Sequence, residues 1–250
     1  MRYFILLLIL LLASCSTKKE VLLFQNTKNI PVKVDFQAPQ IQVNDILSIQ
    51  VSTLQPELAA PYNLIQQSSG AAIQVENLKL QGYLVNPDGK INFPVLGSII
   101  VAGKTPQEVE EIIQTILVKD NHLLSPIVNV RLLNGKVTVL GEVTKPGTYN
   151  YSEQNLSVIQ ALGLAGDLTI KGKRKEVLVI REVAGARSYT TLDLTQTAVF
   201  DSEFYYLKNN DVMVVNPNGA RVKNAGYIGE PATLLGVASV ILSMIILLTR

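Results

Sequence analysis

The carboxylates of this chain are the first candidates for chemistry, because two of them flanking a glycosidic bond can act as acid and base. Glu108, Glu110 and Glu111 fall within one expected helix, where charged residues ordinarily form a solvated face. Glu142 and Asp167 lie near turns further on, and nothing in the sequence places them opposite each other. No nucleophile-elbow motif and no phosphate-binding glycine loop is present. We therefore expect no enzymatic activity and no cofactor.

The cysteine and histidine content limits the remaining chemistry. The 250 residues contain one Cys, one His and no Trp, which excludes a disulfide within the chain and a Cys/His zinc site. His122 follows an expected helix in a polar stretch and is interpreted as an exposed loop residue. Cys15 follows two small residues, and its thiol is the nucleophile that an acyl-glyceryl transfer needs. We expect no metal site, and Cys15 is the candidate for lipid attachment.

The N-terminal segment is typical of an exported protein. After Arg2, an apolar run of about ten residues ends at Ala13, which suits a secretory signal and is shorter than a transmembrane helix. Leu12-Ala13-Ser14-Cys15 resembles the lipobox of bacterial lipoproteins, and Ser16 favours delivery to the outer membrane. The sequence predicts a signal peptide at 1–14 and a lipidated tether at 15–39. The alternative is an ordinary signal peptide in which the Cys is a coincidence.

Residues 82–118 predict a small α+β unit around which the rest is organised. Asn86-Pro87-Asp88-Gly89 indicates a tight hairpin turn, because Pro presets φ and Asp-Gly tolerates the left-handed conformation. Thr105, Pro106 and Glu108 predict a helix start with a capping box. Apolar residues then recur at helical spacing on one face. They are Val109, Ile112, Ile113, Ile116 and Leu117.

This unit also carries a family resemblance. The pattern Tyr83-x-Val85-x3-Gly89-x-Ile91-x-Phe93-Pro94-x-Leu96-Gly97, continued by Val101-x-Gly103-x-Thr105 and the helix, resembles the polysaccharide export (PES) domain of the Wza-type outer-membrane exporters. A turn and strand at 41–51 resemble the opening of that domain, and a strand at 126–132 closes it. We predict this domain at 40–133, with a small mixed β-sheet and a loop-rich excursion at 55–81. The alternative is a generic hairpin-plus-helix scaffold.

Residues 136–216 predict a second unit. Strands are expected at 137–143, 149–151, 176–182, 188–194 and 211–215, with a short helix at 156–164. Gly141-Glu142-Val143-x2-Pro146-Gly147-x-Tyr149, with Ala161-x3-Ala165-Gly166 and Val179-x-Arg181, resembles an SLBB domain, a soluble ligand-binding β-grasp fold. The fold class is therefore expected to be α+β. The basic run at 171–175 either contacts an anionic glycan or lipid phosphates, or is a solvated loop, which is the commoner case.

The C-terminal segment is predicted as a linker at 217–230 and a transmembrane helix at 231–249. It carries no charge between Glu230 and Arg250, and about 18 helical residues span roughly 27 Å, enough for a thin bilayer core. Small residues on one face let helices approach closely in lipid, so we expect self-association there. They are Ala232, Gly236, Ser239 and Ser243. The alternative is a lone anchor with scattered small residues.

The resemblance implies a passive subunit of a homo-oligomeric outer-membrane translocon for capsular polysaccharide or exopolysaccharide. It also implies an inner-membrane copolymerase with its tyrosine kinase as partner, and contact with membrane lipid. Two features depart from the family: only one SLBB-like unit is visible, and the last helix is nearly apolar all round, whereas a water-filled pore needs a polar face. Either a partner outer-membrane barrel completes the channel, or the helix only anchors. The net charge of +2 gives no reason to expect nucleic-acid binding.

Rival interpretations remain at the level of the sequence. The chain could be a non-conducting periplasmic glycan-binding lipoprotein, which would be a monomer that binds glycan without residues 231–250. It could also be an inner-membrane protein with two spans that acts in chain-length control, or a hydrolase. The sequence does not name the glycan-binding residues, the polymer or the number of subunits.

Overall fold

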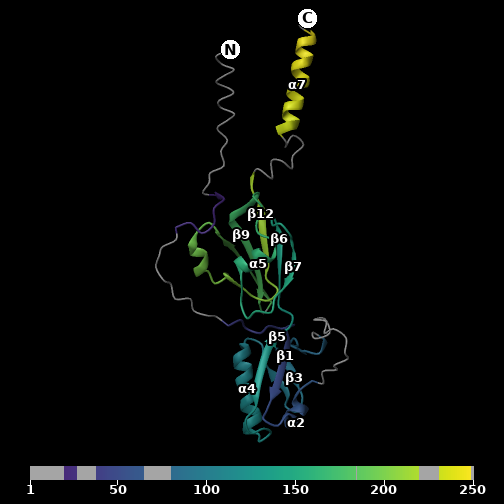
Figure 1. Cartoon of the computed structure of the whole chain (residues 1–250), viewed down its shortest axis with the longest axis vertical. Coiled ribbons are helices and arrows are strands. Elements are labelled where there is room, and N and C mark those ends of the chain that lie inside the picture. The colour runs from purple at the N-terminus through teal and green to yellow at the C-terminus, as the bar shows by residue number, and fades with distance from the viewer. Residues whose placement is uncertain (1–19, 27–37, 65–79, 184, 220–230, 249–250) are drawn as a thin grey trace.

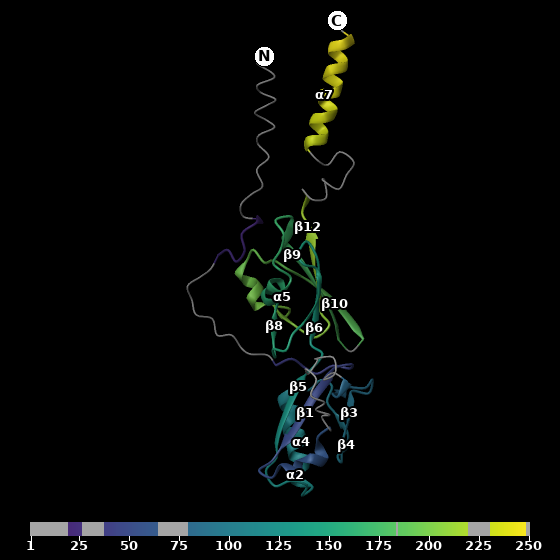
Figure 2. The same cartoon turned by 45° about the vertical axis from the view of Figure 1, so that its right-hand side comes forward.

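The computed structural model describes residues 20–26, 38–64, 80–183, 185–219 and 231–248. They form two α+β domains stacked end to end, which confirms the α+β part of the expected fold class (Figure 1). The second domain lies between the first domain and the C-terminal helix α7 (Pro231–Leu248), as both views of the chain show (Figures 1 and 2). Each domain has a separate apolar core.

The first domain is a small sheet covered by one long helix. Its sheet has the order β2-β1-β5, with β1 antiparallel to both neighbours, and β3 and β4 form a separate two-stranded hairpin. The expected mixed sheet is therefore wrong for this domain, because all of its described strand pairs are antiparallel. Its elements are β1 (Ile46–Ser52), α2 (Pro56–Ala59), η2 (Ala60–Tyr62), β2 (Tyr83–Leu84), β3 (Lys90–Phe93), β4 (Gly97–Ile100), α4 (Pro106–Lys119) and β5 (Ile127–Leu132).

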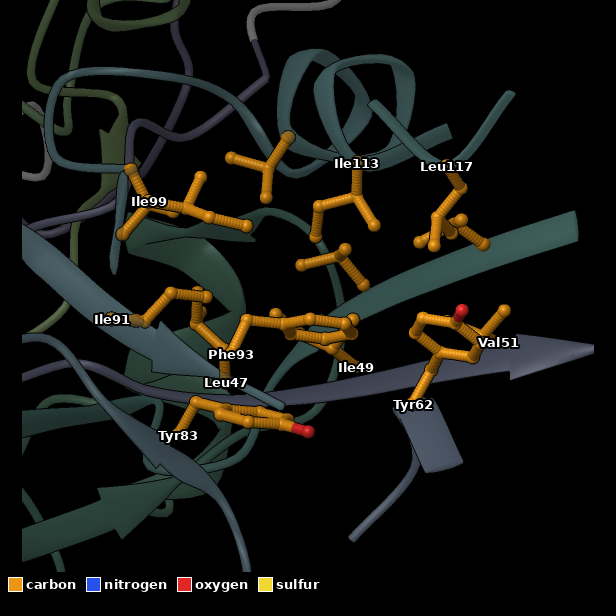
Figure 3. Close-up of a cluster of buried hydrophobic side chains, with 14 of the residues drawn as sticks. Leu47, Ile49, Val51, Tyr62, Tyr83, Ile91, Phe93, Ile99, Ile113 and Leu117 are labelled. Carbon is orange, nitrogen blue, oxygen red and sulfur yellow. The ribbon is translucent and has the colours of Figure 1, made fainter. Parts of the chain in front are cut away.

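The core of this domain lies between α4 and the strands (Figure 3). Ile113 and Leu117 of α4 are fully buried, and the rings of Tyr83 and Phe93 stack with centroids 5.3 Å apart. Burial raises the pKa of Tyr83 to about 12. Its hydroxyl is the one side-chain polar atom in the described part of the chain that is buried without a hydrogen-bond partner.

The start of α4 confirms the predicted capping box. Thr105 Oγ1 accepts the Glu108 N–H at 3.2 Å, and Glu108 Oε2 accepts the Thr105 N–H at 2.7 Å. These two hydrogen bonds satisfy backbone donors that the first turn of a helix leaves open. Of the predicted apolar face, Val109, Ile113 and Leu117 are buried, whereas Ile112 and Ile116 are half-buried.

The turn at 86–89 is present, but it does not close the hairpin that the sequence suggested. Gly89 has a φ of +75°, and its N–H donates to Asn86 O at 2.9 Å, as the turn requires. The strand before the turn, β2, pairs with β1, and the strand after it, β3, pairs with β4. The turn therefore passes the chain from one sheet to the next.

The second domain contains a mixed five-stranded sheet of order β10-β9-β12-β6-β7, in which β12 runs parallel to β6 and antiparallel to β9. Its core is formed by this sheet, α5 and the short pair β8–β11. The elements are β6 (Lys136–Gly141), β7 (Gly147–Asn150), β8 (Leu156–Ser157), α5 (Val158–Leu164), β9 (Gly172–Val183), β10 (Ala186–Leu192), η3 (Thr197–Asp201), β11 (Tyr206–Leu207) and β12 (Val212–Pro217).

The segment at 20–26 lies against the second domain. The Phe24 N–H donates to Leu194 O at 3.0 Å, and the Gln25 N–H donates to Thr195 O at 2.7 Å. The side chains of Leu23 and Phe24 pack against the second core. The sequence suggested a tether that leads to the first domain, but these apolar residues hold the described part of that segment to the second domain instead.

The C-terminal helix α7 forms where the sequence predicts a helix. Its 18 residues extend about 27 Å at about 1.5 Å per residue, against about 30 Å for a typical hydrocarbon core. Within the described ranges, no helix has both the length and the apolar character that crossing a membrane requires. The transmembrane assignment for 231–249 is therefore not supported.

Candidate functional site at the domain junction

The structure describes only some of the residues proposed from the sequence for lipid attachment and helix packing. Cys15 and the signal peptide at 1–14 are outside the described residues, as is the side chain of Ala232. Gly236, Ser239 and Ser243 are exposed on α7. Ser239 Oγ donates to Gly236 O and Ser243 Oγ donates to Ser239 O, both at 2.8 Å. The two serines thus present satisfied hydroxyls on a small-residue face.

The carboxylates weighed for catalysis have local structural contacts. Glu108 caps α4, and its hydrogen bonds from Thr105 lower its pKa. Glu110 Oε1 accepts the N–H of Val130 on β5 at 2.8 Å. Glu142 Oε2 accepts the hydroxyl of Thr169 at 2.7 Å. Over the described ranges, His, Cys, Asp and Glu nowhere form a group of three that could hold a metal ion.

The basic run at 171–175 leads into strand β9, which begins at Gly172. Arg174 is buried, and its guanidinium donates to Gly172 O at 3.0 Å and to Thr169 O at 3.3 Å. Lys173 forms an exposed ion pair with Glu176 at 2.8 Å, and Lys175 lies 3.9 Å from Glu20. Lys173, Arg174 and Lys175 therefore have partners within the chain, which favours the structural interpretation for these three cations.

A network of polar contacts lies where the two domains meet. The chain crosses from β5 to β6 in residues 133–135, and Asn134 ties this linker to the first domain. Asn134 Oδ1 accepts the Ile46 N–H at 2.8 Å, and Asn134 Nδ2 donates to Asn44 O at 3.0 Å. The Leu133 N–H also donates to Ile46 O at 2.8 Å. The linker therefore runs as a continuation of the first sheet.

A direct side-chain contact then joins the domains. Asn209 Nδ2 of the second domain donates to Asp45 Oδ1 of the first at 2.7 Å, and both residues are buried, at 6% and 1% exposure. The other carboxylate oxygen of Asp45 accepts the Gln42 N–H at 2.8 Å, and Asn209 Oδ1 accepts the Lys136 N–H at 2.9 Å. Each partner is thus also fixed within its own neighbourhood, which makes the contact specific in geometry.

The two domains contribute matching turns to this junction. Asn44 and Asn210 both have left-handed φ values, +69° and +67°, and each is followed by a buried Asp that precedes a strand. Asp45 Oδ2 accepts the Gln42 N–H and Asp211 Oδ2 accepts the Lys208 N–H, both at 2.8 Å. An Asp that accepts a hydrogen bond from a nearby backbone N–H stabilises such a turn without help from secondary structure. The two turns are therefore locally encoded.

A buried ion pair supports the turn from the second domain. Arg181 Nη2 of β9 lies 2.7 Å from Asp211 Oδ2, and Arg181 Nε lies 3.1 Å from both carboxylate oxygens. Arg181 Nη2 also donates to Tyr206 O at 2.9 Å, and the guanidinium carbon lies 4.4 Å from the centre of the Phe204 ring. The pair thereby holds residues 204–211, which carry Asn209, against the sheet.

Electrostatic effects agree that these groups share one site. Desolvation by burial raises the pKa of Asp45, although hydrogen bonds from Gln42 and Asn209 oppose the rise. Burial raises the pKa of Tyr151 well above its usual value. The negative charges of Asp45 and Asp211 raise it further, and Arg181 opposes them. One carboxylate from each domain and the Tyr151 phenol thus interact across the junction.

An open cleft of about 930 Å³ borders this network. One wall is the segment 40–44 with the turn residues Pro87 and Gly103 of the first domain, and the opposite wall is the end of the β9–β10 hairpin with Lys208 and Asn210. In Figure 2 this hairpin extends toward the first domain. A smaller hollow of about 210 Å³ shares Gln40 and Lys208 with the cleft. The volume of the larger cleft is in the range of known ligand sites.

Sequence reasoning did not identify the junction. One signal was available, since an Asn-Asp pair before an apolar strand occurs at both Asn44-Asp45 and Asn210-Asp211. A second signal was Arg181 within an otherwise apolar strand, because a buried guanidinium needs a partner. Neither signal reveals that the two turns meet, since 164 residues separate Asp45 from Asn209.

Each of the two domains matches a known protein family model. Residues 35–133 match the family model described as "Polysaccharide biosynthesis/export protein", and residues 136–191 match the SLBB domain model. The chain is 31% identical over 208 residues to the EPS I polysaccharide export outer membrane protein EpsA of Ralstonia solanacearum, covering 78% of this chain and 52% of that protein. The chain thus spans about half the length of this relative.

Two shorter similarities concern related proteins. The capsule polysaccharide export outer membrane protein CtrA of Neisseria meningitidis serogroup B is 31% identical over 131 residues, or 50% of this chain and 32% of that protein. The exopolysaccharide production protein ExoF of Rhizobium meliloti is 36% identical over 88 residues, or 34% of this chain and 21% of that protein. The chain therefore contains a domain of the polysaccharide biosynthesis/export family, followed directly by an SLBB domain.

Proposed function

We propose that this protein is a polysaccharide export protein of the outer membrane, which passes capsular polysaccharide or exopolysaccharide outward as one subunit of an oligomeric translocon. The observation that carries the proposal is the order of the two matched domains, the export domain at 35–133 and the SLBB domain at 136–191. The names of similar proteins, which denote export outer membrane proteins for exopolysaccharide and for capsule, support it. The mechanism is passive, and polymer synthesis with an inner-membrane copolymerase drives transport.

The test is the distribution of polymer between the cell surface and the periplasm in a strain lacking this chain. We expect surface polymer to fall and periplasmic polymer to accumulate, and a plasmid with the full chain to restore the normal distribution. Unchanged surface polymer in the deletion strain would refute export and favour a glycan-binding lipoprotein. A second strain truncated after Glu230 separates α7 from the domains. Loss of surface polymer in that strain as well would assign α7 to the conduit or its assembly.

Attachment to the membrane through a lipid on Cys15 is part of the proposal. Its support is the apolar run that ends at Ala13, with small residues directly before the thiol. Labelling with radioactive palmitate is expected to mark the normal chain and to leave Cys15→Ala unmarked. Label retained by Cys15→Ala would exclude this residue as the acceptor, and an unlabelled normal chain would exclude lipidation.

Self-association through α7 completes the proposal. Gly236, Ser239 and Ser243 fall on one face with Ala232, and the hydroxyls already bonded within the helix leave that face free of open donors. Gly236→Leu is expected to reduce crosslinked oligomers in detergent, because the added side chain separates the helices. Ile241→Leu, on another face, is the matched control. Equal crosslinking in both variants would remove this face from the interface.

A further inference from the structure

We propose that the cleft between the export and SLBB domains binds an acidic oligosaccharide, with Lys136 and Lys208 as the cationic contacts. The proposal deepens the export function, on which it rests, by naming a contact site and the chemical class of sugar. The cleft measures about 930 Å³ and lies open to solvent at the junction, so a segment of a chain-like ligand can enter it.

The lining of the cleft combines apolar residues such as Val43 and Val183 with residues that carry amide groups. Gln40, Gln42, Asn44, Asn134 and Asn210 line it, and of these Asn134 uses both ends of its amide within the first domain. Each side-chain amide carries both a donor and an acceptor, which is the combination that hydroxyl groups pair with. No Phe, Tyr or Trp is among the lining residues, so the cleft offers no aromatic ring on which a sugar could stack. Recognition must therefore come from hydrogen bonds and charge.

The charge of the cleft favours an anion. Two lysines line it, and neither ammonium has a carboxylate within ion-pair distance in the described part of the chain. The lining includes one carboxylate, Glu182, whose Oε2 already accepts two hydrogen bonds from Arg187 at 2.8 and 3.1 Å. Among the lining residues, the lysines therefore carry the charges that have no partner of opposite sign. A uronate carboxylate, which pairs with an ammonium by a charge-assisted hydrogen bond, fits this arrangement.

The two lysines are held in place by their backbones, while their side chains remain available. The Lys136 N–H donates to Asn209 Oδ1 at 2.9 Å, and the Lys208 N–H donates to Asp211 Oδ2 at 2.8 Å. The contact between Asn209 and Asp45 fixes the opposite walls of the cleft relative to each other. A site whose walls are set before binding loses less conformational entropy when the ligand arrives.

The experiment is calorimetric titration of the full chain in detergent with a galacturonic-acid oligosaccharide and with a neutral maltooligosaccharide of the same length. We expect the acidic sugar to bind more tightly, and its affinity to fall as salt is added. The double variant Lys136→Met and Lys208→Met is expected to raise the Kd for the acidic sugar about tenfold or more. Lys119→Met is the matched control, because Lys119 is an exposed residue of α4 outside the cleft.

Three results would overturn the proposal: equal affinity for the two sugars, no binding of the acidic sugar, or equal loss in the double variant and in Lys119→Met. The replacements remove only side-chain ends, since both backbone hydrogen bonds persist, and an unchanged circular dichroism spectrum verifies folding. Failure here differs from failure of the export function, because binding is measured on purified protein and export on cells. Loss of surface polymer in the deletion strain, together with no acidic-sugar binding, would leave export standing and remove this site.

Discussion

Replacing Asp211 by Asn is expected to destabilise the SLBB domain severely. The carboxylate accepts hydrogen bonds from Arg181 at 2.7 and 3.1 Å and from the Lys208 N–H at 2.8 Å, and the side chains of the ion pair are 1% and 5% exposed. Asn keeps the size of Asp but removes the charge, and its amide group then faces N–H donors. Arg181 cannot escape by losing its proton.

The magnitude follows from leaving a buried charge without its partner, which costs about 3–5 kcal/mol. The matched control is Glu182→Gln, which breaks the ion pair with Arg187. Both side chains of that pair are more than half exposed, at 57% and 58%, so water compensates the loss and we expect little change. Removing both buried charges together, with Arg181→Met and Asp211→Leu, is expected to recover much of the stability lost in Asp211→Asn.

The assay is urea unfolding of the full chain, followed by circular dichroism and by the fluorescence of its nine tyrosines, since no Trp is present. Hydrogen exchange at β9 and β12 reports opening of the SLBB domain separately from the export domain. A destabilisation by Asp211→Asn no larger than that by Glu182→Gln would refute the argument. It would mean that water or another group compensates Arg181 in the variant.

Three further predictions concern single positions. Gly141→Ala is expected to lower the free energy of unfolding more than Gly97→Ala. Both glycines have a positive φ, but a Cβ at 141 would lie 2.1 Å from Val215 O, whereas the space at 97 is open. Equal midpoints of urea unfolding for the two variants would contradict this. Thr105→Ala should cost about 1 kcal/mol by removing the cap of α4, with amide exchange rising in the first turn of that helix, and unchanged exchange there would contradict it. Burial raises the pKa of Asp45, so the folded chain holds the proton of this carboxyl group more tightly than the unfolded chain. The free energy of unfolding should therefore fall as pH rises from about 4 through the raised pKa, and then level off. Asp45→Asn should lack this component of the pH profile, and identical profiles would show that Asp45 is not its source.

Local patterns in the sequence predicted the elements whose hydrogen bonds join residues close together in the sequence. The capping box at Thr105 and the turn that ends at Gly89 both formed, because neighbouring residues supply every contact they need. The partner of the strand before that turn could not be predicted in the same way. Either β1 or β3 could pair with Tyr83–Leu84, and the choice depends on how Tyr83 packs in a core assembled from distant segments.

The candidate site was harder to predict than the fold for the same reason. The turns at Asn44-Asp45 and Asn210-Asp211 are each encoded locally, but the hydrogen bond between Asn209 and Asp45 depends on the stacking of two complete domains. Lys136 and Lys208 can likewise be recognised as residues of one cleft only in the folded structure. Residue types along the chain thus predicted the local turns. The contacts between the domains depend on the tertiary structure.

The attachment of residues 20–26 to the SLBB domain has a mechanical consequence. The Phe24 and Gln25 N–H groups are bonded to Leu194 and Thr195, and β12, the last strand before α7, belongs to the same domain. Tension applied between residue 20 and residue 217 is therefore transmitted across the SLBB domain. The export domain lies outside the path of this force. Pulling at these two residues would strain the SLBB core first. The export domain would stay folded until residues 20–26 detached from the SLBB domain.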